Sequence, residues 1–165
     1  MAVTQAVLRP MRADDLGAVL RIQREAYGDG YQESAAVLGA KLALAPQGCW
    51  LAEHGGEALA YVFAHPWHEA APPPLHAPLM ALPAATDTVF LHDLAVARAA
   101  RGSGVAAGLC AKVEAWARRC GARSISLVAL AAAVPYWRRN GYAAVAQTLP
   151  AGYGVGALPM RRALA

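Results

Sequence analysis

The stretch from Val89 to Ala117 constrains the fold of this chain more than any other part of it. It begins with an apolar run over residues 89–96 that suits a strand, and it continues into a small, basic, glycine-rich segment over residues 98–104. From about Ser103 onward the apolar residues follow helical spacing along one stripe: Val105, Leu109, Val113 and Trp116. The stretch therefore predicts a strand, a tight turn and a helix in succession.

The turn at residues 101–104 makes the start of the predicted helix a candidate anion-binding site. The first N–H groups of a helix lack intrahelical acceptors, and the aligned peptide dipoles place partial positive charge there, so this end can bind an anion. Gly102 and Gly104 would let the backbone approach a phosphate closely, and Arg101 adds a fixed charge. A flexible turn with an exposed arginine is the alternative, and the turn alone does not decide between the two.

The size and composition of the chain predict one folded domain over residues 1–165. Hydrophobic residues make up 57% of the 165 positions and charged residues 16%, which favours a packed core over disorder. No apolar run approaches the roughly 18 residues that cross a membrane. Charged residues begin as early as Arg9, which argues against a signal peptide. We therefore expect a cytoplasmic protein with no membrane partner.

Cysteines, histidines and charge exclude several other classes. Cys49, Cys110 and Cys120 are an odd number without C-x-x-C spacing, so buried or half-buried free thiols are expected rather than disulfides or a zinc site. His65 and His68 are close enough in sequence to share a metal, but they lie in a proline-rich stretch, and no metal is expected. The net charge of +4 comes from scattered arginines, so no nucleic-acid partner is expected either.

The remaining segments predict a mixed α/β domain. Periodicity and turn residues indicate strands at 6–9, 49–53, 58–64, 124–130, 142–148 and 155–161, and helices that start at an Asp14 cap, at Glu33 and at Ala132. The first of these helices should stop at Gly28-Asp29-Gly30. Residues 65–87 contain six prolines and little periodicity. Such a loop is either a functional lid or an insertion over the core, and both interpretations stay open.

Two motifs in this chain resemble those of the GCN5-related N-acetyltransferase (GNAT) superfamily. Arg101 to Ala106, RGSGVA, matches the R-x-x-G-x-A form of that family's pyrophosphate loop. Ala133 to Tyr142, AVPYWRRNGY, is similar to its second motif, A-x-x-x-Y-x-x-x-G-F. With the opening segment 9–15, the likeness covers essentially the whole chain. It implies the acyl-CoA N-acyltransferase fold: a mixed, mostly antiparallel central sheet with splayed central strands and flanking helices, in the order β-α-α-β-β-β-α-β-α-β-β.

The resemblance also implies acetyl-CoA as the co-substrate. The family uses the backbone of its central strand, here Leu94, Ala95 and Val96, for the pantetheine arm and the thioester carbonyl. The pyrophosphate would lie on Arg101, Gly102, Ser103, Gly104, Val105 and Ala106, and Trp137 of the second motif would also contact the coenzyme. A dinucleotide fingerprint fits less well, because Gly102, Gly104 and Gly108 are spaced one residue too far apart.

Acetyl transfer to an amine requires a base, a donor to the oxyanion and a proton for the leaving thiolate. Asp93 and His92 are the candidate bases, with a purely structural role as the alternative for each. Strand alternation places them on opposite faces, so only one should face the site. At the position where the family usually has its acidic tyrosine this chain has Trp137, which leaves Tyr136, water or departure of the free thiolate. The family's pantetheine-binding asparagine corresponds to Leu130.

These features together predict an acetyl-CoA-dependent N-acetyltransferase, an acyltransferase that acts on a primary amine. The acceptor is a small-molecule amine or a protein or peptide amine, and a homodimer stays open. The alternative is a non-catalytic or regulatory acyl-CoA-binding protein of the same fold. By resemblance, the acceptor groove is walled by residues 27–33, by residues 65–87 and by the last hairpin. Its side chains would attract a cationic amine or hold an apolar group: Asp29, Glu33, Glu69, Tyr27, Tyr31, Trp67 and Tyr153.

Overall fold

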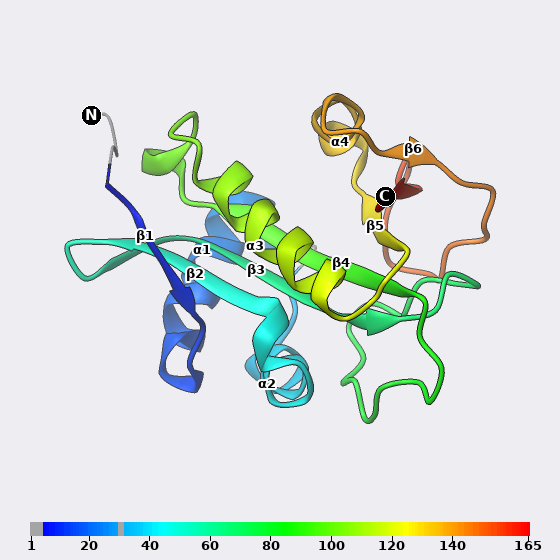
Figure 1. Ribbon diagram of the computed structural model, residues 1–165. Helices are drawn as coiled ribbons and strands as arrows, with labels where there is room; N and C mark the ends of the chain where they lie inside the picture. Colours follow the sequence, from blue (N-terminus) through cyan, green and yellow to red (C-terminus); the bar gives the residue numbers. More distant parts are fainter. Residues whose placement is uncertain (1–4, 30–31) are drawn as a thin grey trace.

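The computed structural model describes residues 5–29 and 32–165, and its centre is one seven-stranded sheet with helices on both faces (Figure 1). The strand order is β1-β2-β3-β4-β5-β7-β6. β4 and β5 pair in parallel, and the other neighbouring strands pair antiparallel. The predicted mixed, mostly antiparallel sheet is therefore confirmed.

The helices and strands follow the predicted order. The strands are β1 (Val7–Pro10), β2 (Cys49–His54), β3 (Glu57–Trp67), β4 (Thr88–Val96), β5 (Ser124–Ala129), β6 (Ala143–Ala144) and β7 (Leu158–Ala163). The longer helices are α1 (Leu16–Tyr27), α2 (Ala35–Leu44), α3 (Val105–Arg119) and α4 (Val134–Arg139). Short 3-10 turns occur at several of the junctions.

The last two strands differ from the sequence prediction. The predicted strand 142–148 reduces to the two residues of β6, and the predicted strand 155–161 is shifted to β7, which begins at Leu158 and ends at Ala163. Gly152, Gly154 and Gly156 between them all have positive φ values. L-residues rarely adopt that backbone region, and repeated positive φ angles bend the chain out of an extended strand.

The structure corrects the predicted helix cap at Asp14. The neighbouring Asp15 makes the contacts of the turn that precedes α1: its carboxylate accepts the Arg12 N–H at 2.7 Å and pairs with Arg9 at 2.8 Å. The second helix begins at Ala35, where the Ser34 hydroxyl accepts the Val37 N–H at 3.2 Å. α1 ends at Gly28, and Gly30 lies outside the described residues.

Two cores lie on opposite faces of the sheet. α3 packs on one face over β3 residues such as Val62 and Ala64, whereas α1 and α2 pack on the other face over Tyr61 and Phe63 (Figure 1). The side chains of β3 thus alternate between the two cores, as a central strand requires. No helix in the described part of the chain is long and apolar enough to cross a membrane.

β4 contains a β-bulge that changes which of its side chains share a face. Asp93 pairs with Phe63 and Leu91 pairs with Ala64, so His92 is the extra residue between them. Leu91 packs in the α3 core before the bulge, whereas Ala95 packs in the α1 and α2 core after it. Because one inserted residue reverses the alternation, His92 and Asp93 both face the α1 and α2 side. The expectation that only one of them faces the site is therefore wrong.

β4 and β5 separate soon after they pair. Their parallel register covers only Thr88 to Phe90 on β4 and Ser124 to Ser126 on β5. Beyond these residues the two strands diverge toward their carboxyl ends, which confirms the predicted splay. The gap lies next to the N-terminus of α3 and is covered by α4 (Figure 1).

Candidate active site

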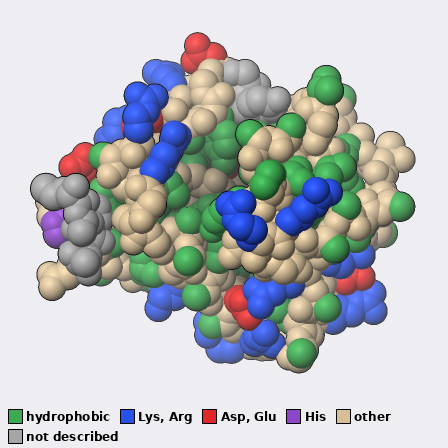
Figure 2. All heavy atoms as spheres, turned by 90° about the horizontal axis from the view of Figure 1, so that it is seen from above, with side chains coloured by type: hydrophobic (Ala, Val, Ile, Leu, Met, Phe, Trp, Pro, Cys, Tyr) green, Lys and Arg blue, Asp and Glu red, His purple; other side chains and the backbone are tan. Residues whose placement is uncertain are grey.

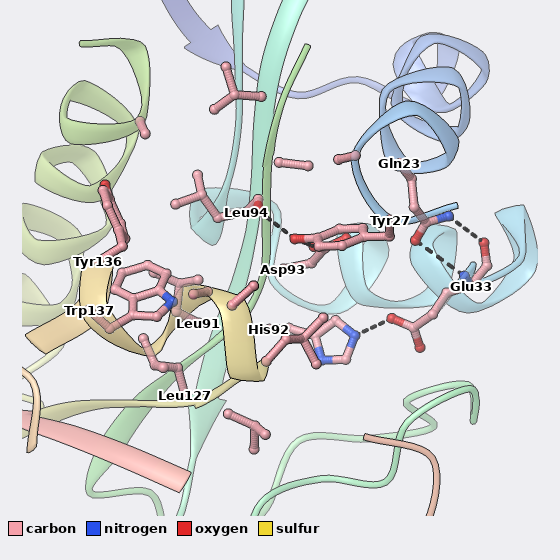
Figure 3. A pocket seen from close by; sticks show the side chains of 18 of the residues that line it. Gln23, Tyr27, Glu33, Leu91, His92, Asp93, Leu94, Leu127, Tyr136 and Trp137 are labelled. Carbon is pink, nitrogen blue, oxygen red and sulfur yellow. Dashed lines mark hydrogen bonds and ion pairs between the residues drawn. The ribbon is translucent and has the colours of Figure 1, made fainter. Parts of the chain in front are cut away.

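A cavity of about 580 Å³ occupies the splay between β4 and β5 (Figure 3). It brings together nine of the predicted site residues: His92, Asp93, Leu94, Ala95, Val96, Arg101, Ala106, Tyr136 and Trp137. Gly102, Ser103, Gly104 and Val105 form the adjoining turn. Seen from above, hydrophobic side chains line a hollow and Lys and Arg side chains stand around it (Figure 2). Segments far apart in the sequence therefore share one hollow with a basic rim.

The turn before α3 has the backbone shape of an anion site. Gly102 and Gly104 have φ values of 77° and 88°, and no heavy atom lies within 4 Å of where a Cβ would stand on either. Gly104 is the N-cap, and its carbonyl accepts the Gly108 N–H at 3.2 Å. The N–H groups of the first helical turn have no intrahelical acceptor and point out of the helix end. Open space above these glycines and free donors fit a pyrophosphate.

The second motif places an indole where the resembling family has a phenol. Trp137 is buried and packs edge-on against Tyr136 and Tyr142, with ring centroids 5.0 and 5.2 Å apart. The Tyr136 ring extends toward α3, away from the Trp137 indole (Figure 3). Burial and the neighbouring Cys110 thiol raise the pKa of Tyr136 to about 12. Tyr136 thus lines the cavity as a weak acid.

Asp93 is surrounded by hydroxyl groups rather than by cations. The Tyr61 hydroxyl donates to its Oδ2 at 2.6 Å, and the Tyr27 hydroxyl lies 2.9 Å from its Oδ1 and 2.6 Å from the Leu94 carbonyl oxygen. A tyrosine hydroxyl has only one proton. A protonated Asp93 satisfies every contact: Tyr27 donates to Leu94, and Asp93 donates to Tyr27. Burial raises the pKa of Asp93, which favours this neutral form.

His92 lies against Glu33, which comes from the segment between α1 and α2. The His92 Nε2 contacts Glu33 Oε1, and the two side chains are only 1% and 3% exposed (Figure 3). Burial alone would raise the pKa of Glu33, but the hydrogen bond with His92, the nearby Lys41 charge and the His76 N–H outweigh it and lower the pKa to about 2. An ionised carboxylate only accepts hydrogen bonds, so the His92 Nε2 carries the hydrogen.

The other ring nitrogen of His92 is therefore the chemically interesting one. Nδ1 is buried and has no hydrogen-bond partner among the described residues. In the neutral ring with hydrogen on Nε2, Nδ1 holds a lone pair. His92 also lines the cavity. A buried imidazole oriented by a carboxylate, with its second nitrogen bare, is the arrangement of a general base.

Glu33 is engaged on every side. Its Oε2 accepts the His76 N–H at 3.0 Å. Gln23 of α1 donates to the Glu33 carbonyl at 3.0 Å and accepts the Glu33 N–H at 3.2 Å. The expected role of Glu33 as a free carboxylate for a cationic amine does not fit these contacts. No sequence signal connects Glu33 to His92, because 59 residues separate them.

The other predicted groove residues mostly bind neighbouring parts of the protein. Glu69 pairs with Arg123 at 2.9 Å and with the Ser124 hydroxyl at 2.6 Å, outside this cavity. Tyr153 donates to the Pro73 carbonyl at 2.9 Å, and Trp67 belongs to β3 and donates to Ala71 at 2.7 Å. Asp29 is exposed, 4.0 Å from Arg24, and Tyr31 lies outside the described residues.

The irregular segment is therefore residues 68–87, and it is held against the site. Leu75 lines the cavity, His76 binds Glu33, and Tyr153 binds Pro73. His65, at the end of β3, is fully buried, and burial lowers its pKa to about 3. Within residues 5–29 and 32–165, no three His, Cys, Asp or Glu side chains are grouped to hold a metal. Cys49 and Cys110 are at least half-buried, whereas Cys120 is exposed.

The fold and site define a class: an acyltransferase-type sheet whose splayed parallel strands hold a cavity beside a glycine-rich helix start. The model of the acetyltransferase (GNAT) family matches residues 16–142. The chain therefore belongs to the GNAT family, as the two motifs predict. No curated protein matches the chain at a significant level.

Solved structures with this fold include three that cover nearly the whole chain. The GNAT-like decarboxylase GphF in complex with isobutyryl-CoA has a TM-score of 0.78 at 19% identity, covering 95% of this chain and 98% of its own. Ard1 from Thermoplasma volcanium has a TM-score of 0.76 at 15% identity, covering 97% and 98%. The NatC complex bound to Gag peptide and CoA has a TM-score of 0.73 at 15% identity, covering 98% and 99%. At these identities the likeness shows the fold alone.

Proposed function

We propose that this protein is an acetyl-CoA-dependent N-acetyltransferase that transfers the acetyl group directly to a primary amine. One observation carries the proposal: a single cavity joins the anion-binding turn at Arg101 and Ala106 to the His92 ring, whose Nδ1 has no hydrogen-bond partner among the described residues. Membership of the GNAT family and the presence of CoA or acyl-CoA in two of the similar structures support it.

The residues around the turn fit a CoA pyrophosphate. The first N–H groups of α3 and the Arg101 guanidinium would hold the phosphates, and backbone N–H groups of residues 94–96 would hold the pantetheine arm. Bound acetyl-CoA would supply an activated thioester. Leu130, in place of an asparagine, offers the arm an apolar side chain only, and it lines the cavity.

We assign the base to His92 rather than to Asp93. The Nδ1 lone pair of His92 would take the proton of the attacking amine, and ionised Glu33 would stabilise the resulting imidazolium. Both oxygens of Asp93 are already bonded to tyrosine hydroxyls, and burial favours its protonated form. Asp93 would then serve by holding Tyr27 against the Leu94 carbonyl, which fixes the backbone of β4 at the site.

Among the described residues, no side chain is well placed to return a proton to the thiolate. An indole N–H does not act as an acid, and the pKa of Tyr136 is raised to about 12. We therefore propose that water supplies this proton or that the thiolate leaves unprotonated.

The cavity favours an amine with an apolar neighbour. Glu33 and Asp93, the two carboxylates on its wall, are both engaged in hydrogen bonds within the protein. Most of the other lining side chains are apolar: Leu75, Leu91, Leu94, Leu127, Val128, Leu130 and Trp137. A small apolar amine and a peptide N-terminus both fit this chemistry, and the NatC complex is bound to a peptide.

A second candidate, an acyl-CoA-binding protein without transferase activity, is favoured by the altered second motif. With Trp137 at the position of the family's tyrosine and the pKa of Tyr136 raised to about 12, the described residues of the site include no efficient acid. GphF, a GNAT-like decarboxylase in complex with isobutyryl-CoA, is an example of this fold in another reaction.

Calorimetry with acetyl-CoA, followed by thiol release with a panel of amines and peptides, separates the two candidates. We expect coenzyme binding and thiol release with at least one acceptor, together with a product heavier by one acetyl group. Binding without thiol release across the panel would favour the second candidate. If acetyl-CoA does not bind at a concentration of about 1 mM, both candidate functions would be overturned.

A further inference from the structure

The two carboxylate oxygens of Glu33 contact two different parts of the chain. Oε1 binds the His92 ring on β4, and Oε2 accepts the His76 backbone N–H from the segment 68–87. These partners are 59 and 43 residues away in sequence. Glu33 therefore joins the central strand to the loop that walls the cavity at Leu75.

The contact with Glu33 selects one form of the His92 ring. Neutral imidazole exists as two tautomers, and the hydrogen bond made by one nitrogen decides which nitrogen carries the hydrogen. With a carboxylate at Nε2, that nitrogen donates and Nδ1 stays bare. Without the carboxylate, nothing else among the described residues would hold the hydrogen on Nε2.

We propose that Glu33 is the positioning residue of this site: it holds His92 in the Nε2–H tautomer with Nδ1 bare, and it seats the segment 68–87 through the His76 amide. The base and the loop that walls the cavity are then assembled by the same side chain. The catalytic consequence rests on the proposed transferase function, whereas the tautomer and the loop contact do not.

Glu33 is held in place from behind. The buried Gln23 side chain forms hydrogen bonds with both the N–H and the carbonyl of Glu33, so the Glu33 backbone is fixed to α1. His76 adopts a φ of 62°, and it is the one non-glycine residue with positive φ in the described part of the chain. Its side chain is exposed, while its N–H is aimed at Glu33. An unfavourable backbone angle kept at this position indicates that the contact is specific.

The tautomer is tested by nitrogen-15 NMR of the histidine rings, with the protein free of coenzyme. In the wild type we expect the neutral His92 ring to carry its hydrogen on Nε2 and to keep Nδ1 bare. In Glu33→Leu we expect a mixture of tautomers, while the exposed Glu57→Gln serves as the control and should match the wild type. Hydrogen on Nδ1 in the wild type, or an unchanged ring in Glu33→Leu, would overturn the proposal.

The loop contact is tested by hydrogen exchange at the His76 amide. We expect exchange to become at least about tenfold faster in Glu33→Leu, because the amide loses its acceptor. In Glu33→Gln the carboxamide oxygen can replace only one of the two contacts, so this milder variant still reports if Glu33→Leu does not fold. His76→Gly keeps the N–H and relieves the backbone, so its amide should stay protected. Unchanged exchange in both Glu33 variants would contradict the loop contact.

The catalytic consequence has its own readout. For an accepted amine, we expect Glu33→Gln to lower kcat by about 10²-fold, the scale of a lost base, with an unchanged KM for acetyl-CoA. If no amine is acetylated, the NMR and exchange results still decide the positioning role. If an amine is acetylated and kcat is unaffected, positioning of the base is refuted while the transferase function stands.

Discussion

The Nε2 atom of His92 lies against Oε1 of Glu33, so a histidine of the central strand and a glutamate 59 residues earlier form one buried unit. This contact leaves the His92 Nδ1 without a hydrogen-bond partner among the described residues, and the His92 side chain lines the cavity. It also occupies the Glu33 carboxylate, which the sequence analysis assigns to binding of the acceptor amine. The chemistry of the site follows from this pairing.

Arg101→Glu should weaken acetyl-CoA binding. The substitution replaces a cation at the rim of the cavity by an anion, next to the helix end that would hold the phosphates. We expect the Kd measured by calorimetry to rise about 10-fold to 100-fold, equivalent to about 1.4 to 2.8 kcal/mol. Arg21→Glu makes the same charge change on the exposed side of α1 and should leave the Kd within about twofold. Equal affinity in both variants would refute the phosphate role.

His92→Gln should abolish most of the transferase activity and leave coenzyme binding intact. Glutamine can still donate an N–H to Glu33, but it has no lone pair that accepts a proton near neutral pH. We expect kcat to fall by about 10²- to 10⁴-fold, the usual contribution of a general base. His54→Gln, on the exposed hairpin, is the matched control. Activity near the wild-type level in His92→Gln would move the base to another group.

Asp93→Asn should be tolerated, because a carboxamide reproduces the neutral acid. Its N–H can donate to Tyr27 and its oxygen can accept from Tyr61. We expect most activity to remain and the free energy of unfolding at pH 7 to change by less than about 1 kcal/mol, whereas Asp93→Ala should cost about 1 to 3 kcal/mol. If Asp93→Asn lost activity as severely as His92→Gln, the aspartate would be the base.

The wild type and Asp93→Asn should differ in how their stability depends on pH. Burial raises the pKa of Asp93 above its value in the unfolded chain, so the folded state holds this proton more tightly. Stability from this group is present at low pH and is lost as pH rises through its raised pKa. As the pH rises above about 4, the ordinary range of an aspartate, we expect urea unfolding to favour Asp93→Asn increasingly over the wild type. The facing titratable groups are common to both proteins: Tyr27, Tyr61, His92, Glu33 and Lys41.

Tyr136→Phe should have little effect on turnover. Burial and the neighbouring Cys110 thiol raise the pKa of Tyr136 to about 12, so its hydroxyl is a poor proton donor. We expect kcat to change by less than about threefold, well below the effect of losing a general acid. The comparison is a kcat measurement at pH 7 and pH 9. A fall of two orders of magnitude would show that Tyr136 turns into the site and acts as the acid.

Acceptors with an apolar group beside the amine should react faster than dicationic amines. Both carboxylates on the cavity wall are engaged, so a second positive charge would find no free partner among the described lining residues. We expect kcat/KM for a phenylalkyl amine or a peptide with an apolar first residue to exceed that for a diamine by at least about tenfold, since one buried apolar side chain is worth about 1.5 to 3 kcal/mol. The reverse order would contradict this assignment of the acceptor wall.

Local patterns determined the coenzyme side of this protein. The apolar strand 89–96, the glycine turn at 101–104 and the helical stripe beginning at Val105 are encoded by neighbouring residues, and the structure places all three as expected. Backbone conformation at Gly102 and Gly104 depends on residue type and not on distant contacts, which is why the sequence could indicate it. The family motifs carry the same local information.

Only the tertiary structure decided the catalytic side. One inserted residue in β4 reverses the side-chain alternation, so His92 and Asp93 share a face although a regular strand would separate them. The partner of His92 comes from the segment between α1 and α2, and the hydroxyls on Asp93 come from α1 and β3. Such contacts depend on how distant segments pack. The sequence by itself therefore indicated the proposed coenzyme site, whereas the bulge and the long-range pairing of Glu33 with His92 determined which nitrogen of the proposed base is without a partner.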